Sequence, residues 1–347
     1  MSASAQPPAG PADLLVVGDC NPDVLVVGGN VTPAFGQQEK LVDAITMVVG
    51  GSAAITAVAA ARLGLRVALA AVVGADAAGG FMLAELAREG VDCSAVIVAP
   101  DAPTAMTVAL SRGADRAILT AIGAAATLTA RDVPAELLQQ ARHVHVSSYF
   151  LLEDSLGAGL AGLFEAARAS GATTSLDTNW DPAGRWGDDR LRAAMAQADL
   201  LLPNEAEALQ LSGRDSLSEA AAELTAAGSR LVIKRGAQGA LCADGGRQYQ
   251  VQPPRLSPVD TTGAGDCFNA GLLAGLACGL QLPQAAALGC AVGGASTQAV
   301  GGTAGAPGRD EALALAKRVT VRPASDTRPP ATRSSSTPWG PPPPAPA

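Results

Sequence analysis

The 347-residue sequence predicts an α/β fold: a mostly parallel central sheet with helices on both faces and a small inserted β-sheet beside it. Two observations support this prediction. Short runs of valine, leucine and isoleucine alternate with alanine-rich segments of helical periodicity, which is typical of strand-helix-strand units. Two longer segments break this alternation and indicate pairs of strands joined by turns.

The central strands are expected where short apolar runs end in polar residues or glycine. They span 13–19, 66–74, 143–148, 173–179, 198–204 and 230–236. Helices are expected at 53–64, 80–90 and 205–213, and directly after residue 266. Because functional side chains gather at the carboxyl ends of parallel strands, Asp19, Asp177, Asn179, Asn204 and Gly236 are expected at one edge.

The two irregular segments lie within about 23–49 and 97–121, and a lid over a substrate is the natural use of the small sheet that they form. After about residue 318 the chain becomes rich in proline, serine and arginine. Such a segment has no apolar periodicity with which to offset the entropy of folding. We therefore expect one folded domain over 13–318 and a disordered proline-rich tail over 319–347.

Composition excludes several classes of protein. The net charge is −8 and no block of lysine or arginine occurs, so no nucleic-acid partner is expected. The N-terminus lacks the pattern of a signal peptide and no apolar run could span a bilayer, which predicts a cytoplasmic protein without membrane contact. Six cysteines without a C-x-x-C pair are expected to be buried apolar residues in a reducing compartment.

The segment DTTGAGD, residues 260–266, predicts an anion-binding turn. Gly263 and Gly265 allow successive N–H groups to converge, and the helix that follows adds the positive charge of its N-terminus. Asp266 falls in the first turn of that helix, where a reactive carboxylate and a plain helix cap both fit. The chain has no Gly-Lys dipeptide, and Phe268 stands where a dinucleotide fingerprint has glycine, so neither alternative phosphate motif is present.

Six segments have the order and spacing of one known family. They are GDCNPD (18–23), GGSAAITAVAAARLG (50–64), VGADAAG (73–79), LLPNEAEALQLSG (201–213), VIKRGAQGAL (232–241) and DTTGAGDCF (260–268). Together they resemble the ribokinase family, the PfkB-type carbohydrate kinases, over about residues 13–318. This resemblance implies a ribokinase-like fold and ATP-dependent phosphorylation of a hydroxyl of a small sugar, with Mg²⁺ accompanying ATP.

The resemblance also implies roles for individual residues. Asp266 would be the general base, and the amides of Gly263, Ala264 and Gly265 would stabilise charge on the transferred phosphoryl group. The nucleotide would be bound by Asn204, Lys234, Gly236, Gly239 and Thr261. Glu207 would hold Mg²⁺ indirectly, and Asp260 and Thr262 match a monovalent-cation loop, which leaves K⁺ dependence open. Lys234 could supply a cation to the anion site or be a surface lysine.

On the acceptor side, the resemblance implies that Asp23, Asn21, Gly50 and Gly51 bind the sugar. The sequence departs from the family pattern at Ser52 and Ile55, where the pattern has lysine and asparagine. Candidate replacement ligands are Ser147, Tyr149 and Asn179. The segment after Asn179 lacks the arginine that contacts acidic substrates in some relatives, which favours a neutral sugar.

Two alternatives to a sugar kinase stay open at this stage. A nucleoside kinase of the same family is one, because Ile55 could form the floor of an apolar base pocket. A non-catalytic sugar-binding or regulatory protein is another. A homodimer formed through the lid is also compatible with the sequence. His143 and His145 alternate along a strand and are interpreted as structural, because two histidines alone do not make a metal site.

Overall fold

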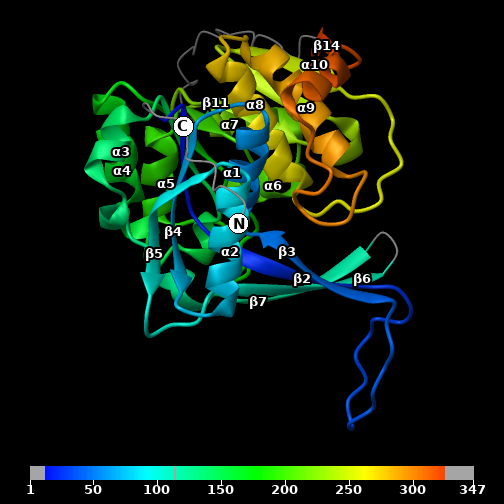
Figure 1. Ribbon diagram of the computed structural model, residues 1–347. Coiled ribbons are helices and arrows are strands. Elements are labelled where there is room, and N and C mark those ends of the chain that lie inside the picture. Colours follow the sequence, from blue (N-terminus) through cyan, green and yellow to red (C-terminus); the bar gives the residue numbers. More distant parts are fainter. Residues whose placement is uncertain (1–11, 113–114, 325–347) are drawn as a thin grey trace, which may run out of the picture.

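The computed structural model describes residues 12–112 and 115–324. Its central sheet has the strand order β14-β13-β12-β11-β10-β9-β8-β1-β4-β5 (Figure 1). The strands are β1 Leu14–Val17, β4 Val67–Gly74, β5 Asp92–Ala99, β8 His143–Val146, β9 Thr173–Leu176, β10 Leu200–Leu201, β11 Arg230–Lys234, β12 Ala240–Asp244, β13 Arg247–Gln252 and β14 Thr320–Pro323. From β11 to β5 all neighbours are parallel, and β12, β13 and β14 extend the sheet antiparallel. The predicted parallel-rich sheet is confirmed.

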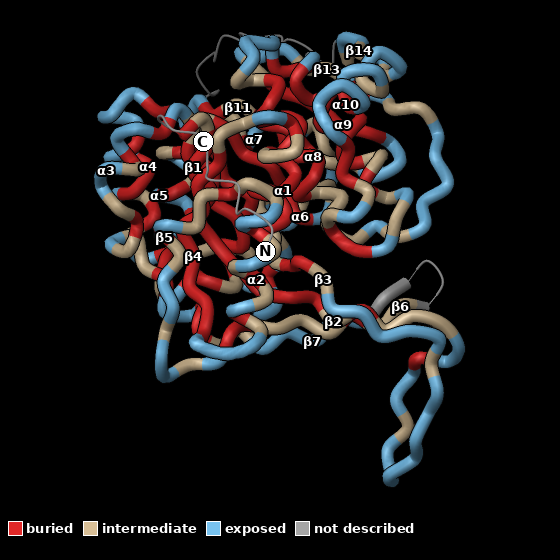
Figure 2. Tube along the Cα trace, in the orientation of Figure 1, coloured by how far each residue is buried: buried red, intermediate tan, exposed pale blue. Residues whose placement is uncertain are grey.

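The central strands are buried on both faces, which is why they are nearly continuous apolar runs. In β1, Leu14 and Val16 belong to one hydrophobic core, and Leu15 and Val17 belong to the other. Figure 2 shows this buried interior in red, running through the strands and their covering helices.

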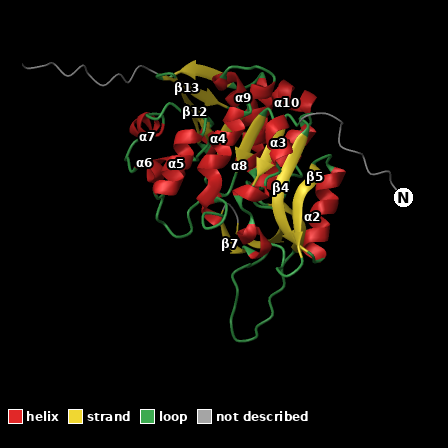
Figure 3. Ribbon diagram, turned by 90° about the vertical axis from the view of Figure 1, so that its left-hand side faces the viewer, coloured by secondary structure: helices red, strands yellow, loops and turns green. Residues whose placement is uncertain are grey.

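Helices cover both faces of the sheet (Figure 3). One core includes side chains of α1 Ser52–Arg62, α2 Ala77–Arg88, α8 Ala264–Ala277, α9 Leu282–Ser296 and α10 Arg309–Ala316. The other includes side chains of α3 Ala135–Gln140, α4 Leu160–Ala169, α5 Asp189–Gln197, α6 Glu205–Ser212 and α7 Leu217–Leu224. Glycines 271, 289 and 293 let α8 and α9 pack closely, since a Cβ on any of them would press against the facing helix.

The lid is a separate sheet with the strand order β3-β2-β6-β7. Its strands are β2 Asn21–Val27, β3 Ala44–Gly50, β6 Met106–Arg112 and β7 Asp115–Ala121, and the connection 28–43 projects away from the body (Figure 1). Residues 97–99, expected within the lid, instead continue β5 beside β4 in the central sheet. Pro100, which has no N–H to donate, ends β5 at that point.

The chain also departs from prediction at the ends of strands and of the domain. The strands expected to reach 148 and 179 end at 146 and 176, because Ser148 (φ 60°) and Asn179 (φ 56°) leave the extended region. Strand β14 lies beyond the expected domain end at 318 and pairs with β13. Residues 325–347 of the expected tail lie outside the described residues.

Two composition-based expectations can be compared with the structure. All six cysteines are free, and most are buried, but Cys278 is exposed after the end of α8. Within residues 12–112 and 115–324, no helix is long and apolar enough to cross a membrane.

Candidate active site

The candidate active site lies where the carboxyl ends of β1, β8, β9 and β11 meet the N-termini of α1 and α8. Asp19 follows β1, Asp177 follows β9, and Lys234 is the last residue of β11. Asp266 lies in the first turn of α8. The parallel topology therefore brings together residues that are more than 240 positions apart in sequence, as expected for this edge of the sheet.

The anion-binding turn predicted at 263–265 has the backbone conformation that it requires. Gly263 is left-handed (φ 67°) and begins α8, and Gly302 lies too close to admit a side chain there. The Ala264 N–H donates to the Thr261 carbonyl at 3.3 Å, so this amide is partly engaged. The N–H groups of Gly265 and Asp266 have no backbone acceptor within the described ranges, so both are available to an anion at the helix N-terminus.

Asp266 is buried, with 8% of its surface exposed, and its side chain does not cap α8. Asp76 and Asp188, by contrast, each accept a capping hydrogen bond at the start of their own helices. The helix-cap alternative for Asp266 is therefore wrong. Burial, and next the charge of Asp177, raise the pKa of Asp266 well above its ordinary value, while Lys234 and a hydrogen bond from Ser52 oppose the rise.

Only 11% of the Lys234 side-chain surface is exposed, and Lys234 forms an ion pair with Asp177, so the surface-lysine alternative is wrong. The second donor to the same Asp177 oxygen is Asn269 Nδ2, at 2.6 Å. Burial lowers the pKa of Lys234, but Asp177 and Glu207 outweigh it and the net shift is upward, so the ammonium stays charged. A Cβ placed on Gly265 would lie 3.6 Å from Lys234 Nζ, which puts this cation beneath the anion-binding turn.

Asn204 and Glu207 form a capping box at the start of α6. Asn204 Oδ1 accepts from the Glu207 N–H at 2.9 Å, and Glu207 Oε2 accepts from the Asn204 N–H at 2.7 Å. Burial, and next Asp177, raise the pKa of Glu207 to about 7. Asn204 also forms an isolated parallel β-bridge with Lys234, so the start of α6 lies beside the end of β11.

The donor set fits a Mg²⁺ ion that arrives with nucleotide better than a resident metal. No cluster of three or more His, Cys, Asp or Glu residues able to hold a metal occurs in the part of the chain that the structure describes. A buried carboxylate such as Glu207, with a raised pKa, would gain from a nearby divalent cation. Mg²⁺ commonly keeps several waters and is bound by one or two carboxylates together with substrate phosphates.

The remaining nucleotide-side predictions occupy turns. Gly236 (φ 52°) opens a short 3-10 turn after β11, and Gly239 (φ 84°) leads into β12. Asp260 Oδ1 accepts from the Thr262 N–H and hydroxyl at 2.9 and 2.8 Å, and Asp260 Oδ2 accepts from the Gly301 N–H at 2.8 Å. This carboxylate fastens the 260–262 loop to the segment that follows α9.

On the predicted acceptor side, β2, a strand of the lid, carries Asn21 and Asp23. Asn21 Nδ2 donates to Asp23 Oδ1 at 3.1 Å and to Thr107 Oγ1 on β6 at 3.3 Å. A Cβ on Gly50 would overlap the Asp23 carboxylate, and Gly51 is left-handed (φ 80°) beside Asn21. The glycine pair therefore makes room for these two lid side chains.

The three candidate replacement ligands differ in position. Ser147 has no exposed surface and its hydroxyl bonds the His145 ring, and Tyr149 is 1% exposed in the core. Asn179 lies at the edge of the site, where its side chain links Ser148 and Ser52. The structure thus brings only Asn179 of these three to the open edge.

The two histidines, of which His145 is buried and His143 half-buried, belong to a polar ladder between β8 and β9. His143 bonds Thr173 and Ser175 at 2.6 and 2.7 Å, and His145 bonds Ser175 and Ser147 at 2.7 and 2.9 Å. Burial, the largest cause, lowers the pKa of His143 to about 3 and that of His145 to about 4. Both rings are therefore neutral near pH 7, in keeping with the structural interpretation.

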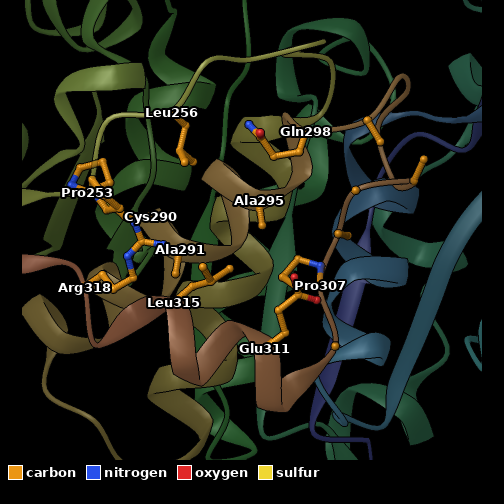
Figure 4. Close-up of a pocket in the computed structure, with 16 residues that line it drawn as sticks. Pro253, Leu256, Cys290, Ala291, Ala295, Gln298, Pro307, Glu311, Leu315 and Arg318 are labelled. Atoms are coloured by element: carbon orange, nitrogen blue, oxygen red, sulfur yellow. The ribbon is translucent and has the colours of Figure 1, made fainter.

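A cavity of about 420 Å³, which the sequence did not single out, lies between the 253–256 loop, α9 and α10 (Figure 4). Leu256, Cys290, Ala295 and Gln298 line it. The same loop continues to Val259 and Asp260, whose N–H groups donate to the Thr297 carbonyl. The cavity therefore adjoins the loop that carries the anion-binding turn.

A lidded α/β sheet with buried carboxylates and an anion-binding helix N-terminus at one edge defines a small-molecule kinase. The chain matches the model of the pfkB family carbohydrate kinases over residues 11–309, and it belongs to that family. It is 32% identical to a 2-dehydro-3-deoxygluconokinase of Bacillus subtilis over 72% of this chain and 81% of that protein. It is 28% identical to a ribokinase of Haemophilus influenzae over 76% of this chain and 86% of that protein.

Solved structures agree on the fold. A PfkB protein from Polaromonas sp. JS666 superposes with a TM-score of 0.74 at 26% identity, over 87% of this chain and 99% of that one. A ribokinase II candidate from E. coli, solved with ATP and Mg²⁺, superposes with a TM-score of 0.79 at 24% identity, over 88% and 99% of the two chains. The ribokinase-like fold predicted from the sequence is confirmed, and the chain is an ATP-dependent carbohydrate kinase.

Proposed function

We propose that this kinase transfers the γ-phosphoryl group of ATP to a hydroxyl of a small neutral sugar, with Asp266 as the general base. One observation carries the proposal: a buried carboxylate that does not cap its helix lies at an anion-binding helix N-terminus, beside a buried lysine. A raised pKa makes Asp266 a stronger base than an exposed aspartate, as this task requires.

In the proposed step, Asp266 takes the proton of the acceptor hydroxyl while that oxygen bonds to the γ-phosphorus. The bond from the γ-phosphorus to the oxygen that bridges it to the β-phosphorus breaks, and ADP leaves with that electron pair. The proton then passes from Asp266 to solvent. The amides of Gly263, Ala264 and Gly265 and the ammonium of Lys234 stabilise the charge that builds on the transferred group.

We assign the nucleotide to the groups around β11 and α8. Asn204, Gly236, Gly239 and Thr261 form the walls next to the phosphates, and the cavity beside the 253–256 loop takes the nucleoside. Its volume is within the range of small-ligand sites. Mg²⁺, when bound, neutralises phosphate charge, and Glu207 would hold it through water. K⁺ binding at Asp260 and Thr262 stays a prediction.

The acceptor would lie under the lid, against Asp23 and Asn21. Carboxylate and amide oxygens suit sugar hydroxyls, which donate to them. Arg185, the nearest arginine in sequence after Asn179, is held by Glu153. These groups favour a neutral acceptor, although the Bacillus subtilis relative is named for an acidic one.

The nucleoside alternative loses the observation on which it depended. Ile55 is buried, and its side chain packs against Gly263 and Gly302 behind the anion-binding turn, so it does not form the floor of an open pocket. A non-catalytic role does not explain why the Asp266 carboxylate and the Lys234 ammonium lie together in the interior. Removing charged groups from water costs free energy.

The test is to follow ADP release by the purified chain with ATP, Mg²⁺ and a panel of ribose, fructose, 2-dehydro-3-deoxygluconate and nucleosides. We expect turnover with a neutral sugar, and Asp266→Asn should lower kcat by a factor of about 10²–10⁴ with little change in KM for ATP. Turnover of the acidic sugar alone would overturn the neutral-acceptor assignment. An Asp266→Asn enzyme with most of its kcat would remove Asp266 from the role of base.

Two further proposals concern the whole protein. A cytoplasmic location stays a prediction. A homodimer through the lid is supported by exposed apolar side chains on its strands, Ile45, Met47, Ile118 and Leu119. Light scattering at micromolar concentration gives the mass in solution, and the mass of one chain would contradict the dimer.

A further inference from the structure

Arg62, the last residue of α1, joins the end of α2 to the segment that follows α9. Its Nε and Nη2 donate to the two carboxylate oxygens of Glu89 at 2.7 and 2.9 Å, and Glu89 directly follows α2. Its Nη1 donates to the carbonyls of Thr303 and Ala306, the latter at 3.3 Å. All three guanidinium nitrogens are therefore engaged, and only 24% of the Arg62 side-chain surface is exposed.

The segment that accepts from Arg62, residues 301–307, lies between α9 and α10 and forms neither helix nor strand. Its sequence is GGTAGAP, and Gly301 is left-handed (φ 96°). Glycine loses more conformational freedom on folding than any other residue, so such a segment needs contacts with other elements to keep one conformation. The two hydrogen bonds from Arg62 are contacts of that kind.

This segment contacts both the anion-binding turn and the cavity beside the 253–256 loop. At one end Gly302 lies against Gly263, where a Cβ on Gly263 would come within 2.7 Å of it, and the Gly302 carbonyl accepts from Cys267 Sγ at 3.3 Å. At the other end, residues 304–307 line the cavity (Figure 4). The carbonyls that Arg62 binds lie directly after the first contact and within the second.

Helix α1 also supports the reacting groups. Ile55 packs against Gly263 and Gly302, and Thr56 Oγ1 donates to the Asp266 carbonyl at 3.3 Å. The helix therefore contacts the anion-binding turn near its start and the cavity wall at its end. Holding the segment to this helix keeps the cavity wall at a fixed distance from the turn that would bind the phosphates.

We propose that Arg62 is a positioning residue for nucleotide binding, which holds residues 303–306 as a preformed wall of the nucleoside cavity. This inference rests on the proposed place of the nucleoside in that cavity. A preformed wall strengthens binding, because the cost of ordering the segment is met on folding and not when ATP arrives. Without Arg62, ATP has to order the segment itself, so binding weakens while the chemistry of the bound complex is unaltered.

The first test compares two arginines with similar surroundings. Arg62→Met should raise the Kd for ATP, measured by calorimetry with Mg²⁺, by about 10-fold, because it removes charge-assisted hydrogen bonds from the wall. The kcat at saturating ATP and the acceptor KM should stay within about two-fold of wild type.

Arg66→Met is the matched control. Arg66 binds both carboxylate oxygens of Asp13 at 3.0 and 2.9 Å and is 32% exposed. These residues precede β4 and β1, at the edge of the sheet opposite the site. The control should melt at a lower temperature and bind ATP as wild type does. An equal loss of ATP affinity in Arg66→Met would overturn the proposal, and so would unchanged ATP affinity in Arg62→Met.

Arg62→Lys provides a folded variant should Arg62→Met fail to fold. It keeps the positive charge and an aliphatic stem, but a single ammonium cannot reproduce the fork that binds Glu89 and two carbonyls together. The Kd for ATP should therefore rise by about three-fold or more. Wild-type affinity in Arg62→Lys would show that charge alone suffices and would overturn the positioning role.

Hydrogen exchange follows the segment without turnover. The Ala306 N–H donates to the Thr303 carbonyl at 3.1 Å, within the part that Arg62 holds. It should exchange faster in Arg62→Met than in wild type and slow again when ATP is saturating. Equal exchange in the two proteins without ATP would overturn the proposal.

Leu256→Trp separates the role of Arg62 from the assignment of the cavity. The larger side chain narrows the cavity from the 253–256 loop, so ATP should bind more weakly if the nucleoside lies there. Normal ATP binding in Leu256→Trp would overturn the cavity assignment and this proposal with it. Weaker binding in Leu256→Trp together with normal binding in Arg62→Met would overturn the role of Arg62 alone.

Discussion

Lys234 is the residue on which the charge balance of the site depends. It is surrounded by Asp177, Glu207 and Asp266, and its ammonium is the buried cation that offsets them. Lys234→Met should lower the free energy of unfolding by about 3–5 kcal/mol, because it leaves Asp177 charged and unpaired in the interior. Urea unfolding at pH 7.5 measures this loss.

The double variant separates stability from function at this residue. Lys234→Met with Asp177→Asn removes both charges of the pair, so most of the stability should return while kcat stays at least 100-fold down. If the double variant recovered turnover as well, Lys234 would be a structural cation with no role toward the phosphoryl group.

The raised pKa of Glu207 predicts how the stability of the protein depends on pH. Its pKa is raised to about 7 from an ordinary 4.5, so its contribution to stability is present below about pH 4.5 and is lost as pH rises through 7. Glu207→Gln resembles the protonated form and keeps the capping box, since glutamine also serves there. The variant should therefore gain stability relative to wild type between pH 5 and 8.5, by at most about 3 kcal/mol.

Thermal melts of both proteins across that range, without nucleotide or Mg²⁺, provide the measurement. Glu205→Gln, in the same first turn but more exposed, is the control and should show no such trend. A constant difference in Tm from pH 5 to 8.5 would mean that Glu207 is ionised in the folded protein throughout.

Sequence reasoning was strong where a residue's position depends on a local motif and weaker where it depends on a distant partner. The turn at Gly263 and the place of Asp266 in the first turn of α8 could be predicted because one glycine-rich turn and one helix start determine them. The Ser52 hydroxyl oxygen accepts a hydrogen bond from Asn179, 127 residues later in the chain. No local pattern reports that contact.

At the scale of the elements, the lid contributes the residues that we propose bind the acceptor sugar. Asp23 projects from β2 toward Gly50, next to the glycine pair that leads into α1. Asp23→Ala should raise the acceptor KM by about 30-fold or more, because it removes a carboxylate that would accept sugar hydroxyls, and should leave the Kd for ATP within about two-fold. Steady-state kinetics and calorimetry with ATP measure the two quantities.

Asp43→Ala is the matched control for this element, because it removes an exposed carboxylate from the same lid. It should change neither quantity. Weaker ATP binding in Asp23→Ala, with the fold intact by circular dichroism, would reverse the assignment of the two half-sites.

The positions of the strands were predicted more accurately than the residues at which they end. The nearly continuous burial of β1, β4 and β8 gives a clear apolar signal, whereas the points at which β8 and β9 stop are set by hydrogen bonds to other elements. Ser148 and Asn179 bond each other across the two strand ends. Segment 97–99 continues β5 because it finds a partner in β4, and the turn signals nearby did not reveal that pairing.

For the whole molecule, the edge of the sheet sets the limit of the folded domain. Composition placed that limit at 318, but β14 pairs with β13 through Val251 and Val321, and Val319 and Val321 pack against the core on the α9 side. A four-residue strand has too little apolar periodicity to be recognised next to a proline-rich segment. Only its pairing with β13 identifies it.

The last prediction follows from that pairing and compares two shortened chains. A chain ending at residue 324 keeps β14 and should melt within about 1 °C of the full protein, since the segment removed has no apolar pattern with which to pack. A chain ending at 318 loses the β13-β14 hydrogen bonds and the contacts of Val319 and Val321, and should melt several degrees lower. It also leaves β13 as an exposed edge, which favours association between chains, so light scattering on heating is the second readout. Equal melting temperatures for the two shortened chains would show that β14 adds nothing to the folded domain, and a large loss in the 324-residue chain would show that residues beyond 324 support it.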